Sequence, residues 1–227
     1  MPRGAKRRRK PATSGAASNP ARNVFINCPF DEQYSPLFRA AIFAVMDCGF
    51  KPRTAMEVDD SSEIRIEKIC RIIADCRYGI HDLSRTELDP TTRLPRFNMP
   101  LELGIFLGAK RFGDDEQSRK NGLVLDTERY RYQQFISDIS GQDIYAHGGQ
   151  VDRLITAVRN WLKSASRRKS LPGGASITDR FRKFESDLPM LCHKLQISVG
   201  EVTYPDFVGL AATWLDEYTA VQRTVSP

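Results

Sequence analysis

Residues 24–31, which read Val-Phe-Ile-Asn-Cys-Pro-Phe-Asp, contain the pattern that decides the fold. Three apolar residues form a short run that ends at residues 27–29, a pattern typical of a buried strand followed by a loop. Apolar side chains then recur at helical spacing from Leu37 to Met46, and Gly49 ends this expected helix. A strand followed directly by a helix predicts the first unit of an α/β domain.

The same alternation of strand and helix patterns continues through residues 23–165. Short apolar runs predict the strands, and apolar residues at i, i+3 and i+4 predict the helices. Further strands are expected at Lys51–Met56, Tyr78–Leu83, Gly122–Asp126 and Asp143–Ala146, and further helices at Ile69–Cys76, Pro100–Lys110, Gln133–Ile139 and Val151–Lys163. This order predicts a parallel sheet of about five strands with helices on both faces.

The pattern beyond this domain consists of helices alone. Residues 166–176 read as a linker, and residues 177–227 hold two amphipathic helical patterns. The first begins with capping-box spacing at 176–179 and is expected to be kinked or split by Pro189. The second is expected to begin near Pro205. Because two helices enclose little core by themselves, we expect this extension to pack on the α/β domain or to form a homo-oligomer.

The net positive charge is concentrated in one tail. The sequence has 34 Lys and Arg against 28 Asp and Glu, a net charge of +6. Residues 1–20 hold six of the basic residues and none of the acidic ones, so the remainder carries 28 of each sign. We therefore expect residues 1–22 to be a disordered basic tail, capable at most of weak contact with nucleic acid, on a neutral body.

The composition also excludes several classes of protein. No apolar run approaches the ~18–20 residues of a membrane span, and the basic N-terminus lacks the apolar region of a secretory signal. The five cysteines include no C-x-x-C pair, which argues against a zinc site or a disulfide framework. We expect a cytoplasmic protein that has no membrane contact, no metal and no cofactor.

Four of the expected strands are ended or followed by an acid: Asp31, Glu57, Asp82 and Asp126. Ligands of open parallel sheets bind outside the carboxyl ends of the strands, so these acids predict a polar site there. Helix capping explains each acid equally well when it is taken singly. Arginines in the same loops favour a ligand with phosphate groups: Arg53, Arg65, Arg85 and Arg96.

The segment Asn98-Met99-Pro100-Leu101-Glu102-Leu103-Gly104 contains the most informative acid. If Pro100 begins a helix, Glu102 is the third helical residue, a position from which a glutamate caps the helix. The helix dipole is expected to keep a carboxylate ionised there. An ionised carboxylate suits a nucleophile, or a stabiliser of positive charge on a ribose carbon. Both roles, cap and catalyst, remain open for Glu102.

Two segments resemble a known superfamily. Residues 24–31 resemble the first strand and loop of Toll/interleukin-1 receptor (TIR) domains and of nucleoside 2-deoxyribosyltransferases. Asp82-Leu83-Ser84, followed by residues 98–104, resembles their catalytic segment. The resemblance covers residues 23–165 and implies a flavodoxin-like sheet. It also implies that Glu102 is catalytic and that Asp82 contacts the sugar or the base.

The activity implied by this resemblance is cleavage of the ribosyl N-glycosidic bond of NAD or a related nucleotide, as in bacterial defence or stress effectors. The expected substrate-binding residues are Cys28, Pro29, Phe30, Asp31, Arg53, Glu57, Arg65, Ser84, Asn98 and Met99. A nicotinamide leaving group is already activated by its positive charge, whereas a neutral base needs a proton donor, for which Asp31 or His81 is nearest. Base exchange of the deoxyribosyltransferase type and a catalytically silent nucleotide sensor remain alternatives.

Overall fold

The computed structural model describes residues 19–57, 60–86, 88 and 93–225, and its centre is a five-stranded parallel sheet. The strands are β1 (Asn23–Asn27), β2 (Lys51–Arg53), β3 (Tyr78–Asp82), β4 (Asn121–Asp126) and β5 (Ile144–Ala146). They lie in the order β2-β1-β3-β4-β5, and every neighbouring pair is parallel. This is the flavodoxin-like order, so the predicted α/β fold class is confirmed.

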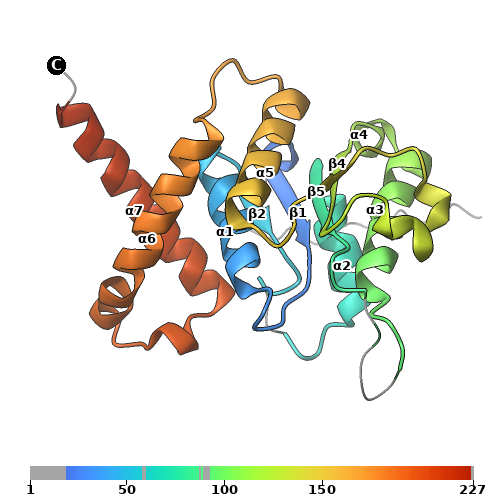
Figure 1. Cartoon of the computed structure of the whole chain (residues 1–227), viewed down its shortest axis with the longest axis horizontal. Coiled ribbons are helices and arrows are strands. Elements are labelled where there is room, and N and C mark those ends of the chain that lie inside the picture. The colour runs from blue at the N-terminus through green and yellow to red at the C-terminus, as the bar shows by residue number, and fades with distance from the viewer. Residues whose placement is uncertain (1–18, 58–59, 87, 89–92, 226–227) are drawn as a thin grey trace, which may run out of the picture.

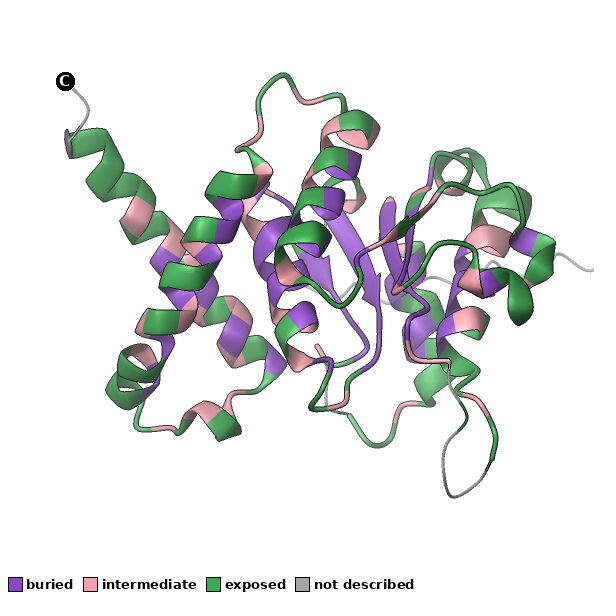
Figure 2. Ribbon diagram, in the orientation of Figure 1, coloured by how far each residue is buried: buried purple, intermediate pink, exposed green. Residues whose placement is uncertain are grey.

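Helices cover both faces of the sheet, as Figure 1 shows. The helices α1 (Ser35–Asp47) and α5 (Val151–Ser166) pack on one face. The helices α2 (Arg65–Ala74) and α3 (Asn98–Phe112) pack on the other, and the short α4 (Asp115–Ser118) follows α3. The central strands β1 and β3 are buried along their whole length (Figure 2), which explains the apolar run at residues 24–26.

The C-terminal extension packs on the outer side of α1 and α5. It consists of α6 (Gly174–Lys194) and α7 (Tyr204–Val225), which lie beyond those two helices from the sheet (Figure 1). Phe43 of α1 stacks against Phe184 of α6, with ring centroids 5.4 Å apart, and its centroid lies 6.0 Å from that of Trp214 of α7. The apolar faces of the extension thus join the core of the α/β domain within one chain.

Several predicted boundaries differ from the structure. The strand expected at Lys51–Met56 ends at Arg53, because the backbone turns there and the Met56 amide donates to the Thr54 hydroxyl. The helix expected at Gln133–Ile139 is two short 3₁₀ helices, Arg131–Gln134 and Ser137–Ile139. Neither turn continues into an α-helix.

The first helix of the extension begins earlier than expected and is not split by Pro189. It begins at Gly174, inside the expected linker and before the expected capping box. A Cβ at Gly174 would lie 2.7 Å from the Thr156 hydroxyl, so the glycine permits close packing on α5. The helix also runs unbroken through Pro189, since buried residues on both sides of the proline, such as Phe184 and Cys192, hold it in place.

The expected basic tail lies mostly outside the described residues. Its last part, Pro20–Arg22, forms a short 3₁₀ helix whose Pro20 carbonyl accepts from the Arg77 amide, so regular structure begins before Asn23. Among the described residues, no helix combines the length and the apolar content needed to cross a membrane.

Candidate functional site

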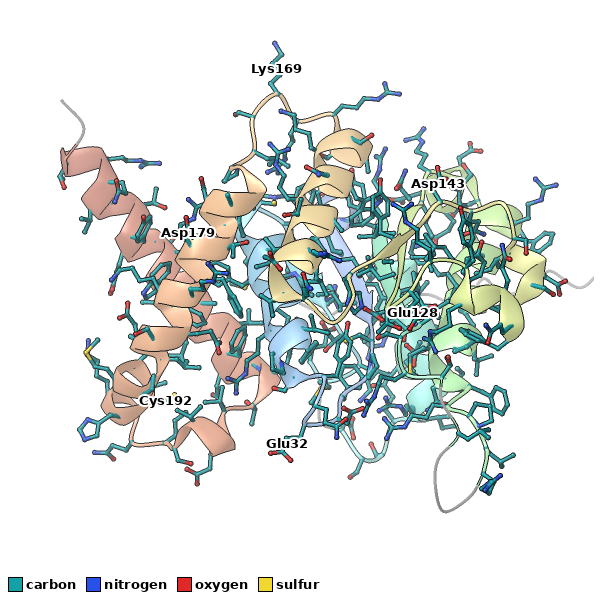
Figure 3. The ribbon with its side chains drawn as sticks, viewed as in Figure 1. Glu32, Glu128, Asp143, Lys169, Asp179 and Cys192 are labelled. Carbon is teal, nitrogen blue, oxygen red and sulfur yellow. The ribbon has the colours of Figure 1, made fainter. Side chains whose placement is uncertain are left out.

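The loops that follow β1, β2 and β3 meet at one edge of the sheet, the lower edge in Figure 1. Glu32, labelled at that edge in Figure 3, belongs to the loop after β1, whereas Lys169 marks the opposite edge. The chain leaves β1 toward α1 on one face and leaves β3 toward α3 on the other. The crevice between these two strands is the usual ligand site of open α/β sheets.

Buried hydrogen bonds fix α3 to this crevice. The Asn27 side-chain amide, at the end of β1, donates to the Met99 carbonyl at 2.8 Å and lies 3.2 Å from His81 Nδ1. Because an amide N–H faces Nδ1, this ring nitrogen is the acceptor. Burial, reinforced by the charge of Lys120, lowers the pKa of His81 to about 3. The imidazole is therefore neutral and does not suit the proton-donor role considered for it.

Glu102 is a buried carboxyl that lacks a partner among the described residues. It is 6% exposed, and it makes no hydrogen bond or ion pair with any residue that the structure describes. Burial raises the pKa of Glu102 to about 7, against the lowering effect of Arg65. The expectation of a helix cap held ionised by the dipole is wrong, because α3 begins at Asn98 and Glu102 lies in its second turn.

Asp82 is also buried, but both of its oxygens are occupied. Its Oδ2 accepts from the Tyr34 hydroxyl at 2.6 Å and lies 3.0 Å from His147 Nε2, while Oδ1 accepts from the Ser84 amide. The Gly149 amide donates to His147 Nδ1, which leaves the ring proton on Nε2, facing Asp82. Burial raises the pKa of Asp82, but the contacts from His147, Ser84 and Tyr34 outweigh it and lower the pKa.

The contacts with Tyr34, His147 and Ser84 give Asp82 a buried position that its sequence pattern did not predict. The expectation placed it against the sugar or the base, whereas the structure leaves it no exposed surface. Tyr34 is 4% exposed and His147 is 1% exposed, so both partners of Asp82 are buried with it. The one sequence signal was the pair Gly148-Gly149, whose positive φ angles of 60° and 72° form the turn that orients His147.

The other three strand-end acids are paired with arginines. Asp31 accepts from Arg85 at 3.2 Å and from Arg96 at 3.0 Å, and Glu57 accepts two hydrogen bonds from Arg53. The buried Asp126 at the end of β4 pairs with Arg131 in the same way. Arg53 is thus held by Glu57 instead of being open to a phosphate. Glu102 differs from all these acids, since no residue in the described part of the chain pairs with it.

A cavity of about 610 Å³ lies between these loops and the C-terminal extension. Four of the expected substrate-binding residues line it: Phe30, Asp31, Glu57 and Arg65. The opposite wall comes from residues 202–205 and Phe207 of the extension. The other expected residues do not line it: Cys28, Pro29, Arg53, Ser84 and Met99 are buried, and Asn98 is exposed at the start of α3.

Glu102 does not line this cavity, but it interacts electrostatically with a residue that does. Arg65, which does line the cavity, acts electrostatically on Glu102. The Cys28 thiol has a pKa raised by burial first and then by the charges of Asp82, Glu102 and Asp31. The Cys28 thiol therefore stays protonated and is unsuited to be a nucleophile.

Fold and site together define a flavodoxin-like α/β protein with a buried carboxyl, unpaired among the described residues, beside the crevice between β1 and β3. No family model, curated protein or solved structure matches the chain. Within the part of the chain that the structure describes, no group of three or more His, Cys, Asp or Glu residues is arranged to hold a metal ion.

Proposed function

We propose that this protein cleaves the N-glycosidic bond between ribose and base in NAD or a related nucleotide, with Glu102 as the catalytic residue. The observation that carries the proposal is the buried carboxyl of Glu102, which no described residue pairs and whose pKa is raised to about 7, beside a cavity large enough for a nucleotide. Burying a carboxyl without a partner destabilises a fold, and such groups are concentrated at functional sites.

The chemistry needs a carboxylate next to the anomeric carbon. As the bond between C1 of ribose and the base nitrogen breaks, its electron pair leaves with the base and positive charge develops on the sugar. The ionised Glu102 either stabilises this charge or bonds to C1, after which water displaces the carboxylate and the ribose product is released.

The surroundings of Glu102 favour a base that leaves without a proton. His81 is neutral and buried, with a pKa of about 3, and Asp31 is held by two arginines. Neither of the two candidate donors therefore suits the protonation of a neutral leaving base. Nicotinamide attached to ribose carries a positive charge and leaves as a neutral molecule, so NAD fits this site better than an uncharged nucleoside.

Incubation of the purified chain with NAD and, separately, with purine and pyrimidine nucleosides tests the proposal. We expect chromatography to detect free nicotinamide and ribosylated product from NAD, and little free base from the nucleosides. Addition of a second base distinguishes hydrolysis from base exchange, since exchange yields a new nucleoside. Thermal shift on the same samples identifies a silent sensor, for which NAD raises the melting temperature while no base is released.

A further inference from the structure

We propose that the cavity between the α/β domain and the C-terminal extension binds the nucleoside-diphosphate half of the substrate, and that the extension is therefore part of the binding site. This inference rests on the proposed function in taking the ligand to be part of a dinucleotide. A volume of about 610 Å³ lies within the range of small-molecule sites, roughly 300–1,000 Å³.

The two acids that line the cavity form ion pairs with arginines that do not line it. Asp31 pairs with Arg85 and Arg96, and Glu57 pairs with Arg53 through two hydrogen bonds. None of these three arginines is among the lining residues. Neither carboxylate therefore pairs with Arg65, which faces the cavity.

Three basic side chains line the cavity, and one of them, Arg65, is available to an anion. Arg65 is exposed and forms no ion pair with any described residue. Arg39, which also lines the cavity, pairs with Glu185 at 3.5 Å and stands over the Phe207 ring, 5.8 Å from its centroid. Lys68 also lines the cavity. Guanidinium groups bind phosphate oxygens with two parallel hydrogen bonds, so this wall suits a diphosphate.

An aromatic surface faces the same space. Phe30 lines the cavity and is 39% exposed, although it is a large apolar side chain. Phe38 supports it edge-to-face, with ring centroids 5.3 Å apart, and stacks in turn on Tyr204. An exposed ring supported from behind is a surface on which a nucleobase stacks. A ligand that carries both phosphate groups and an aromatic base is a nucleotide.

The extension wall is bonded to the sheet and capped at the start of α7. The Tyr204 hydroxyl donates to the Pro52 carbonyl of β2 at 2.7 Å. The Thr203 hydroxyl donates to Asp206 at 2.6 Å, and this pair caps the first turn of α7. The wall is therefore preorganised by the fold, and the extension has a role beyond packing.

Titration of the full-length Glu102→Gln protein with ADP by calorimetry tests this inference, because ADP has no nicotinamide bond to cleave. We expect binding, and a loss of affinity of about ten-fold or more in Phe30→Ala, since a stacking ring is removed. Arg65→Gln should weaken the binding of ADP much more than the binding of adenosine, because adenosine has no phosphate groups. Val202→Trp, which places a large side chain in the cavity from the extension, should abolish ADP binding.

Leu195→Trp is the matched control, because Leu195 lies on the same extension and is exposed outside the cavity. It should leave ADP binding unchanged. Unchanged affinity in Phe30→Ala overturns the inference even if Val202→Trp fails to fold. If ADP binds as described but NAD releases no base, the inference stands and the proposed function fails. If NAD releases base but the chain does not bind ADP, the proposed function stands and the inference fails.

Discussion

Glu102 should destabilise the folded chain at neutral and alkaline pH. Its pKa is raised to about 7 in the folded state, so between its ordinary value of 4.5 and about 7 the folded chain holds a proton that the unfolded chain has lost. Stability therefore falls as pH rises through this window. We expect Glu102→Gln to be more stable than wild type by roughly 1–3 kcal/mol at pH 8 and nearly equal at pH 4, measured by urea unfolding. A less stable Gln variant at pH 8 would show that the carboxylate has a partner in solution.

The same pKa predicts the pH dependence of the reaction. If the ionised form acts, kcat/KM for NAD rises by about ten-fold from pH 6 to pH 8, with a midpoint near 7. Initial rates of nicotinamide release at low NAD concentration measure this profile. A rate that falls over the same range would mean that Glu102 acts as an acid, contrary to the proposed role.

At the scale of elements, the contacts of Asp82 hold three segments together. Tyr34 lies just before α1, Asp82 ends β3, and His147 follows β5. We expect Asp82→Asn to lower the free energy of unfolding by about 2–4 kcal/mol at pH 7 and Tyr34→Phe by about 1–2 kcal/mol, because buried partners lose their bonds. The difference in stability between wild type and Asp82→Asn should shrink in acid. The pKa of Asp82 is lowered in the folded chain, so the stabilisation by its carboxylate disappears as pH falls through this lowered pKa.

Asp138→Asn, at an exposed site, serves as the control for that series and should leave the unfolding curve unchanged. If Asp82→Asn unfolds at the same urea concentration as wild type, the contacts of Asp82 with Tyr34 and His147 do not stabilise the fold.

The elements were more predictable from the sequence than the contacts between them. Strand and helix patterns are local, so the five strands and the order of the helices followed from residues a few positions apart. The pairing of Asp82 with His147 joins residues 65 positions apart, and nothing in either local pattern specifies it. Glu102 was identified by its motif, but its raised pKa depends on burial, which only the packing of α3 reveals.

At the scale of the whole molecule, the extension and the α/β domain share one core. Phe184 of α6 is fully buried and contacts Phe43, Phe207 and Trp214. We therefore expect Phe184→Ala to cost about 3–5 kcal/mol and to destabilise both parts together. The chain has two tryptophans, Trp161 in α5 and Trp214 in α7, so Trp161→Phe and Trp214→Phe leave one reporter in each part.

Coincident urea midpoints from the two reporters would support a single cooperative unit, and well-separated midpoints would refute it. Leu195→Ala, an exposed position of the same extension, should change neither midpoint by much. The sequence predicted that these helices pack on the domain or on another chain, and it left the choice open because the amphipathic pattern is the same in both cases. The structure shows the packing within the chain.

The most direct test of the proposed activity is the rate of nicotinamide release from NAD by three proteins at pH 8: wild type, Glu102→Gln, and Glu116→Gln as a control at an exposed site on α4. We predict release by wild type and the control at equal rates, and a loss of at least about a hundred-fold in Glu102→Gln, because the catalytic carboxylate is removed. Release by Glu102→Gln at the wild-type rate, or no release by the folded wild-type chain, would contradict the central claim.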